Sequence, residues 1–202
     1  MLSIIFKALR KGLNIAVNLI YTPYARWVLY LNNASFGKNL KINGFLKVHI
    51  TRKGSMCLGD NVKINSGYNH NIIGRQQKSI FWVDGSLKIG HNTGMSATAI
   101  ICNDKIEIGD NVLIGGNTVI YDTDFHSLDP KIRFNKNLDK KTAKKGKVTI
   151  GNNVFIGSHS TILKGVSIGN NSVIGACSLV SKNVPENQIW AGNPIRFIKN
   201  LD

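Results

Sequence analysis

Aliphatic residues recur at every sixth position along much of the chain. The unbroken run consists of Ile150, Ile156, Ile162, Ile168, Ile174 and Val180. Earlier runs with the same spacing are Ile108, Ile114 and Ile120, then Val83, Ile89, Met95 and Ile101, and more faintly Phe36, Ile42 and Val48, and Leu58 and Ile64. A period of six fits neither the 3.6 of an α-helix nor the two of a β-strand. It indicates a solenoid of short repeats.

Polar turn residues stand at fixed offsets from this ladder, as in Gly109-Asp110-Asn111 and Gly169-Asn170-Asn171. Glycine, Asn and Asp tolerate the positive φ that tight corners require. We therefore expect an all-β parallel β-helix over residues 34–184, in which three flat faces use about 18 residues per turn and the aliphatic ladder fills the interior. A β-sandwich would instead show two-residue alternation and hairpin turns.

The ladder and the closing segments 180–185 (VSKNVP) and 190–196 (WAGNPIR) resemble the hexapeptide-repeat acyltransferase superfamily. Within it, the maltose and galactoside O-acetyltransferases and the capsule or lipopolysaccharide O-acetyltransferases are the most similar. The resemblance implies a left-handed coil, which spacing alone does not reveal because parallel crossovers are normally right-handed. It also implies acetyl-CoA as donor and a homotrimer.

One long interruption, residues 121–149, breaks the ladder, and such an insertion in a solenoid is most often functional or disordered. It contains His126, which follows Asp122 and Asp124. A neutral imidazole suits proton abstraction from a hydroxyl near pH 7. We expect His126 to be a general base, with Asp124, Asp122 or a backbone carbonyl holding its other ring nitrogen. The resembling families also place a catalytic histidine at the start of this loop. The alternative is a solvated loop histidine.

The resemblance implies further binding residues. Ser158 and Ala176 match positions that line the pantetheine arm, Ser181 and Lys182 match a pair near the nucleotide, and Arg196 matches a basic residue of the tail. Phe155 stands where maltose-type relatives carry a tryptophan, so we expect an aromatic wall at the acceptor without an indole N–H. His159 is a weaker candidate for acceptor contact. The alternative for Lys182 and Arg196 is solvated surface charge.

The net charge of +15 is concentrated in two segments. Residues 1–59 hold nine Lys and Arg and no acid, and residues 126–147 hold eight against two acids. A nucleic-acid site would require stacking aromatics beside the loop lysines, and none accompanies them, so we expect no nucleic-acid partner. A zinc site is not expected either, because His126 and His159 would supply only two of three ligands and Lys164 stands where a third would be sought.

Cys57, Cys102 and Cys177 lie far apart in an odd number, which favours free thiols in a reducing compartment. Residues 1–33 predict an amphipathic helix, with apolar Ile5, Leu9, Leu13, Ala16 and Ile20 on one face. This face could contact a membrane interface peripherally, cap the open end of the β-helix or pack in the trimer. We see no cleavable leader or spanning segment and expect a cytoplasmic protein, either free or peripheral on the inner membrane face. Residues 185–202 are expected to form a tail.

Together these features predict an acetyl-CoA-dependent O-acetyltransferase that acts by direct transfer on a sugar hydroxyl in surface-polysaccharide or glycoconjugate synthesis. The acceptor could be free, nucleotide-linked or lipid-linked. The first alternative is an N-acetyltransferase of an amino sugar, since an amine uses the same donor but needs less help from a base. The second is a non-enzymatic β-helix binding protein.

Overall fold

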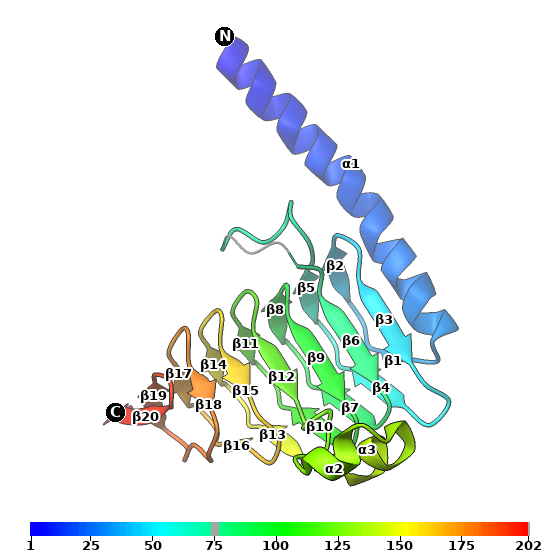
Figure 1. The fold of residues 1–202 in the computed structure, drawn as a ribbon. Helices are drawn as coiled ribbons and strands as arrows, with labels where there is room; N and C mark the ends of the chain where they lie inside the picture. The colour runs from blue at the N-terminus through cyan, green and yellow to red at the C-terminus, as the bar shows by residue number, and fades with distance from the viewer. Residues whose placement is uncertain (74–76, 202) are drawn as a thin grey trace.

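The computed structural model describes residues 1–73 and 77–201, apart from the side chains of Asn14 and Asn18. A long helix, α1 (Leu2–Leu31), leads into a coil of short strands that wind around a triangular prism (Figure 1). Successive strands pass from one face to the next, so that each face becomes a parallel sheet. The coil is left-handed.

Three sheets form the faces of the prism, and up to β18 each is made of every third strand. Sheet A contains β1 (Ser35–Phe36), β4 (Ser55–Leu58), β7 (Ser86–Ile89), β10 (Lys105–Ile108), β13 (Val148–Ile150) and β16 (Ser167–Ile168). Sheet B contains β2 (Lys41–Asn43), β5 (Lys63–Asn65), β8 (Gly94–Ser96), β11 (Leu113–Ile114), β14 (Phe155–Ile156), β17 (Val173–Ile174), β19 (Gln188–Ala191) and the antiparallel β20 (Arg196–Asn200). Sheet C contains β3 (Lys47–Ile50), β6 (Ile80–Val83), β9 (Ala99–Cys102), β12 (Val119–Tyr121), β15 (Thr161–Ile162) and β18 (Leu179–Val180).

The core of the prism is the predicted aliphatic ladder. In sheet B, Ile114 is in register with Ile156, which is in register with Ile174, and all three are buried. Like residues therefore stack directly above one another from coil to coil, which removes a continuous column of apolar surface from water. The corners are stabilised separately by a file of asparagines with positive φ, whose side-chain amides hydrogen-bond from one coil to the next; its members are Asn39, Asn61, Asn92, Asn111, Asn153, Asn171 and Asn187.

The six-residue register is wrong at Ile101, which we predicted inside the prism. β9 is a four-residue strand whose buried members are Ile100 and Cys102. Side chains alternate along a strand, so Ile101 between them faces outward. On that outer surface Ile101 lies beside residues of β6 that line the groove described below.

Helix α1 is attached to the first coil only through its C-terminal third. Ala25 and Leu29 are fully buried, and the Thr22 hydroxyl donates to the Ile42 carbonyl at 3.1 Å and accepts from the Ile42 N–H at 3.0 Å. The helix continues through Pro23, which follows the predicted apolar face and lies among aromatic residues in the sequence. Its N-terminal part stands clear of the coil in Figure 1. Within residues 1–73 and 77–201, no helix is both long and apolar enough to cross a membrane.

Candidate active site

The insertion between β12 and β13 folds into a closed loop carrying two short helices, α2 (Pro130–Arg133) and α3 (Lys136–Thr142). Its stem is held by backbone hydrogen bonds from Asp124 N–H to the Lys144 carbonyl and from Gly146 N–H to the Asp122 carbonyl, both at 2.9 Å. The loop helices lie against the edge of the prism near β7 and β10 (Figure 1). The loop is therefore an ordered part of the fold.

His126 is paired with a buried carboxylate from the second loop helix. Its Nδ1 lies 2.7 Å from Oδ2 of Asp139, whose other oxygen accepts the Ser127 N–H at 2.6 Å. The Asn135 side chain caps the start of α3 and so places Asp139 in the first turn, facing back toward the histidine. The hydrogen bond from His126, followed by that from the Ser127 N–H, holds the pKa of Asp139 below its ordinary value.

This arrangement fixes how the imidazole is protonated. An ionised Asp139 can only accept, so the Nδ1 beside it carries a proton and Nε2 keeps its lone pair in the neutral ring. The His126 side chain is 67% exposed, whereas that of Asp139 is 8% exposed. The ring is thus oriented from behind and open to solvent in front, which is the arrangement a general base needs.

The expected carboxylate partners of His126 are corrected by this geometry. Asp122 is buried and accepts the backbone N–H groups of Asn103 and Asp104 at 2.7 and 2.8 Å, so both of its oxygens fix a corner of the coil. Asp124 pairs with Lys164 at 2.7 Å. Asp122 and Asp124 lie on the stem of the loop, and their carboxylates bind groups of the coil instead of the His126 ring. The carboxylate at the ring is Asp139.

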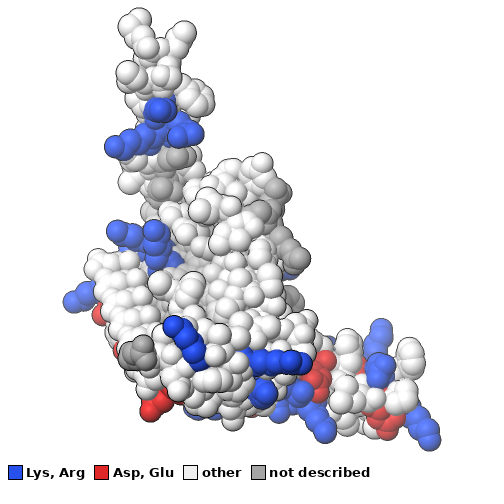
Figure 2. Space-filling model, turned by 90° about the vertical axis from the view of Figure 1, so that its left-hand side faces the viewer, with Lys and Arg blue, Asp and Glu red and all other residues white. Residues whose placement is uncertain are grey.

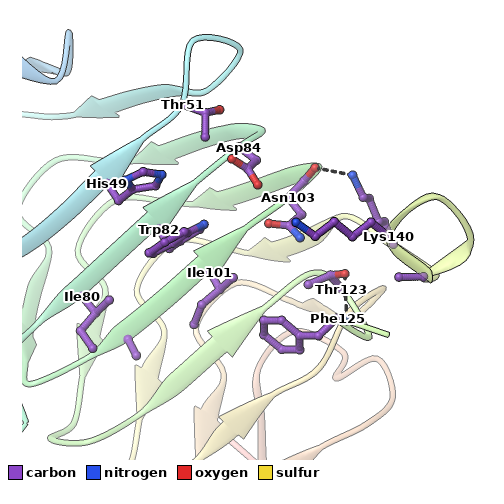
Figure 3. A pocket seen from close by; sticks show the side chains of 13 residues that line it. His49, Thr51, Ile80, Trp82, Asp84, Ile101, Asn103, Thr123, Phe125 and Lys140 are labelled. Atoms are coloured by element: carbon purple, nitrogen blue, oxygen red, sulfur yellow. Dashed lines mark hydrogen bonds between the residues drawn. The ribbon is translucent and has the colours of Figure 1, made fainter. Parts of the chain in front are cut away.

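A groove of about 760 Å³ runs along the outer surface of sheet C toward the loop. Its floor is made of outward-facing residues of β6 and β9, among them Trp82 and Ile101, and the rings of His49 and Trp82 stack at 4.1 Å between centroids (Figure 3). Figure 3 shows Phe125, the neighbour of His126, at the opposite end. The groove therefore begins on an aromatic pair and ends beside the residue that precedes the candidate base.

Polar groups line one side of the same groove. Asp84, Asn103 and Thr123 occupy equivalent places at the ends of successive strands, and Lys140 and Lys145 reach in from the loop. The Lys145 ammonium donates to the Asn103 carbonyl at 3.0 Å, which ties the loop to the coil. A floor of apolar and aromatic surface with a few polar groups along one edge is the usual composition of a small-molecule site.

The residues expected at the donor lie elsewhere on the chain. Ser158 and Ala176 occupy the same corner, between sheets B and C, on successive coils, where the Cys177 N–H donates to the Ser158 carbonyl at 2.9 Å. His159 follows at that corner with a φ of 62°. Ser181, Lys182 and Arg196 are exposed near the C-terminal end of the coil, and the Lys182 ammonium lies 5.2 Å from the centroid of the Trp190 ring.

A single chain does not bring all of these residues together. Phe155 is half exposed on the outer surface of sheet B, whereas His126 belongs to the loop between sheets C and A. Phe155 and His126 therefore lie on different sides of the prism.

Comparisons with known proteins find the repeat on both sides of the loop. The family model for the bacterial transferase hexapeptide (six repeats) matches residues 147–182, and that for the hexapeptide repeat of succinyl-transferase matches residues 105–121. Both models describe repeats of hexapeptide-repeat transferases, and the matches support the resemblance to the hexapeptide-repeat acyltransferase superfamily. This confirms both the predicted fold class and the predicted resemblance.

Among its relatives is the galactoside O-acetyltransferase of Escherichia coli K12, 40% identical over 123 residues that make up 60% of this chain and 58% of the relative. The putative lipopolysaccharide biosynthesis O-acetyl transferase WbbJ of the same organism is 29% identical over 83% of this chain and 82% of its own. The chain thus spans less than two thirds of the first of these relatives.

A similar solved structure is that of a variant of AntD, an N-acyltransferase from Bacillus cereus, in complex with dTDP-4-amino-4,6-dideoxyglucose and coenzyme A. It has a TM-score of 0.66 and 26% identity, and the match covers 88% of this chain and 89% of that one.

Sequence reasoning missed Asp139 and the groove on sheet C. Asp139 had a signal in the sequence, because it is one of only two acids among the loop lysines and follows Asn135, a good helix cap. The groove also had one, since large apolar residues at outward positions of a solenoid face mark a binding surface. His49, which lies in β3 and stacks on Trp82, was missed as well.

Proposed function

We propose that the protein is an acetyl-CoA-dependent O-acetyltransferase that modifies a sugar hydroxyl in surface-polysaccharide or glycoconjugate synthesis. The observation that carries this proposal is the pair formed by His126 and Asp139, an exposed imidazole whose Nδ1 is 2.7 Å from a buried carboxylate. The relatives include proteins named galactoside and lipopolysaccharide O-acetyltransferases, and these names support an acetyl group as the group transferred and a sugar as the acceptor.

In the proposed mechanism, Asp139 keeps the proton on Nδ1, so that Nε2 of His126 accepts the proton of the acceptor hydroxyl. The hydroxyl oxygen forms a bond to the thioester carbonyl carbon, and the carbon–sulfur bond then breaks. The CoA thiolate that leaves takes a proton from the imidazolium, which restores the neutral base. Transfer is direct and forms no covalent enzyme intermediate. A positioned base of this kind contributes about 10²–10⁴-fold.

For the donor, we propose a site built from Ser158 and Ala176 along the pantetheine arm and from Ser181, Lys182 and Arg196 near the phosphates. Backbone groups at a corner and a few cations match an apolar arm that ends in anionic phosphates. The similar AntD structure, which contains coenzyme A, supports a CoA donor. Because Ser158 and Ala176 lie at the corner between sheets B and C, whereas the loop of His126 leaves the corner between sheets C and A, we propose a homotrimer in which the site forms between neighbouring copies.

For the acceptor, we propose the groove on sheet C together with Phe155 and His159 of a neighbouring copy. Sugar rings present apolar C–H faces that pack on aromatic rings such as Trp82, while carboxylate and amide groups such as those of Asp84 and Asn103 bind hydroxyls. Lys140 and Lys145 at the edge favour an acceptor that carries phosphate, as nucleotide-linked and lipid-linked sugars do. We propose a cytoplasmic enzyme that reaches such acceptors at the inner membrane face.

The alternative with a specific observation in its favour is N-acetylation of an amino sugar, because AntD is an N-acyltransferase crystallised with an amino-sugar nucleotide. An amine attacks a thioester with less help from a base than a hydroxyl does. Loss of the His126 base should therefore slow N-transfer much less than O-transfer.

The test is a thiol-release assay with acetyl-CoA and a panel of sugars and amino sugars, both free and nucleotide-linked, followed by mass spectrometry of the product. Acceptor-dependent CoA release with an alkali-labile ester on a hydroxyl supports O-transfer. An alkali-stable amide would establish the N-acetyl alternative, and the absence of CoA release with every acceptor would favour a binding protein.

A further inference from the structure

Helix α1 binds the coil with one side of its C-terminal third, and its exposed apolar residues include Ile4, Ile15 and Leu19 as well as the set described next. Residues that touch the first coil, Thr22, Ala25 and Leu29, fall on one side at 3.6 residues per turn. On the opposite side, large apolar residues fall within about 120° of the circumference. They are Leu2, Ile5, Phe6, Leu9, Leu13, Ile20, Tyr24, Trp27, Tyr30 and Leu31, each at least 41% exposed. We call this set the outward face of α1.

Among the described residues, the outward face is uncovered except at Tyr24, whose ring packs edge-on against Phe45 at 5.2 Å between centroids. Every described side chain from Met1 to Ile20 is exposed, and this part of the helix stands clear of the coil in Figure 1. The coil contacts the outward face only near Tyr24 in the described residues, because it is bound mainly to the opposite side of the helix through the buried Ala25 and Leu29. At 1.5 Å per residue the outward face extends for about 45 Å, which is far more apolar surface than a soluble monomer usually leaves open.

The charges on α1 are all positive and lie away from the outward face. Lys7, Arg10 and Lys11 fall on the same side as the residues that bind the coil. Figure 2 shows a band of basic atoms across the projecting helix between two uncharged stretches. The chain has no acidic residue before Asp60, so nothing on the helix neutralises these cations.

We infer that α1 docks the protein on an anionic lipid surface. The outward face lies in the interface between headgroups and acyl chains, and Lys7, Arg10 and Lys11 extend to anionic headgroups. Tyr24, Trp27 and Tyr30, near the coil, are the residue types that settle at this depth. Since the coil is bound to the opposite side of the helix, it remains in water when the outward face is in the membrane.

A second copy of the chain fits this face less well. Packed helices in water use a narrow seam of apolar positions, flanked by acidic and basic residues that pair across the contact. Here the apolar arc is wide and every charge on the helix is positive, which complements a negative surface and not another copy of the same helix.

The experiment is flotation of the full chain with vesicles, either of phosphatidylcholine alone or of phosphatidylcholine and phosphatidylglycerol in equal parts. It needs no acceptor and no activity, so its result is independent of the proposed function. We expect the chain to float with the anionic vesicles and much less with the neutral ones. The variant K7Q/R10Q/K11Q should bind the anionic vesicles on the order of 100-fold more weakly, because a basic residue near such a surface contributes about 1 kcal/mol, or about fivefold.

The matched control is K38Q/K41Q/K47Q, which removes the same charge from exposed positions of the coil and should float like the unaltered chain. A second variant, L9Q/L13Q, should abolish flotation without changing the oligomeric state measured by light scattering. Failure of the full chain to float with anionic vesicles would overturn the inference, as would equal loss in the control. An altered oligomeric state in L9Q/L13Q with normal flotation would assign the outward face to a second copy instead.

Discussion

The Asp139 carboxylate lies 2.7 Å from Nδ1 of His126, and the two residues are 13 positions apart on either side of a helical turn. The contact depends on the loop doubling back through α2 and α3. It turns a solvent-exposed histidine into a ring with a defined tautomer, because the ionised carboxylate retains the Nδ1 proton. The insertion therefore supplies the fold with chemistry that the repeats themselves lack.

Replacement of Asp139 by Asn should lower kcat for acetyl transfer about 100-fold, because an amide in this place no longer selects the tautomer in which Nε2 is the base. The KM for acetyl-CoA should change little, since the donor residues lie elsewhere. The measurement is steady-state CoA release. Asp129→Asn is the matched control in the same loop, as Asn can still cap α2, and equal losses in the two variants would contradict a positioning role for Asp139.

Glu107 should stabilise the protein in a pH-dependent way. Hydrogen bonds from Lys105 and Lys147 lower the pKa of Glu107 from its ordinary 4.5 to about 2, so its contribution is present above pH 4.5 and disappears as the pH falls to about 2. Glu107→Gln should reduce the free energy of unfolding at pH 7 by less than about 1 kcal/mol, because these partly exposed pairs are screened by water.

Urea unfolding of Glu107→Gln and of the unaltered protein, at pH 7 and at pH 2, is the measurement. The difference should vanish at pH 2 and shrink in high salt. Glu186→Gln serves as control, since the structure shows no ion pair for Glu186 among the residues it describes. A difference that persists at pH 2 would refute the ionic origin.

Cys102 should resist thiol reagents in the folded protein. Burial, and then the nearby Asp122 carboxylate, raise the pKa of its thiol to about 12, whereas Cys57 and Cys177 are exposed. A chromogenic disulfide reagent at pH 8 should therefore react with two thiols at once and with the third only after denaturation. The Cys102→Ala variant should still show two reactive thiols, and three reactive thiols in the folded protein would contradict the burial of Cys102.

The asparagine file at the corners should contribute to stability through backbone conformation as well as hydrogen bonds. Asn111 has a φ of 57°, accepts from the Asn92 amide and donates to Asn153, both at 3.0 Å. Asn111→Ala should reduce the free energy of unfolding by about 2 kcal/mol, since alanine disfavours positive φ and makes neither bond.

Asn111→Gly loses the same two hydrogen bonds but tolerates the backbone, so its loss should be smaller, about 1 kcal/mol. Asn137→Ala, on the exposed surface of α3, is the control and should stay within about 0.5 kcal/mol of the unaltered protein. Urea denaturation compares the three variants. If glycine and alanine destabilise equally, the positive φ is not the cause.

The repeating part of the fold was predictable because each hexad is a local pattern. The run from Ile150 to Val180 reappears as stacked, buried ladder positions. The left hand of the coil came only from the resemblance, since no local property of a hexad determines it. Ile101 was misplaced because strand alternation within β9 overrides the count of six at that point.

The site was less predictable because its contacts join distant segments. Asp122 and Asp124 were expected beside His126 from nearness in sequence, yet the stem turns their carboxylates toward Asn103 and Lys164. The stack of His49 on Trp82 joins two coils and depends on which residues face outward. Such pairs follow from the completed coil and loop, and no single segment of sequence contains them.

The most direct test of the account is acetyl transfer by His126→Asn, measured as CoA release with an accepted sugar. The account predicts that kcat falls about 10²–10⁴-fold. The KM for acetyl-CoA should change little, because the proposed donor residues lie elsewhere, and the thermal unfolding temperature should fall only slightly, because the 67% exposed His126 side chain loses one hydrogen bond, to Asp139. A rate within about threefold of the unaltered enzyme on a hydroxyl acceptor would contradict the assignment of His126 as the base.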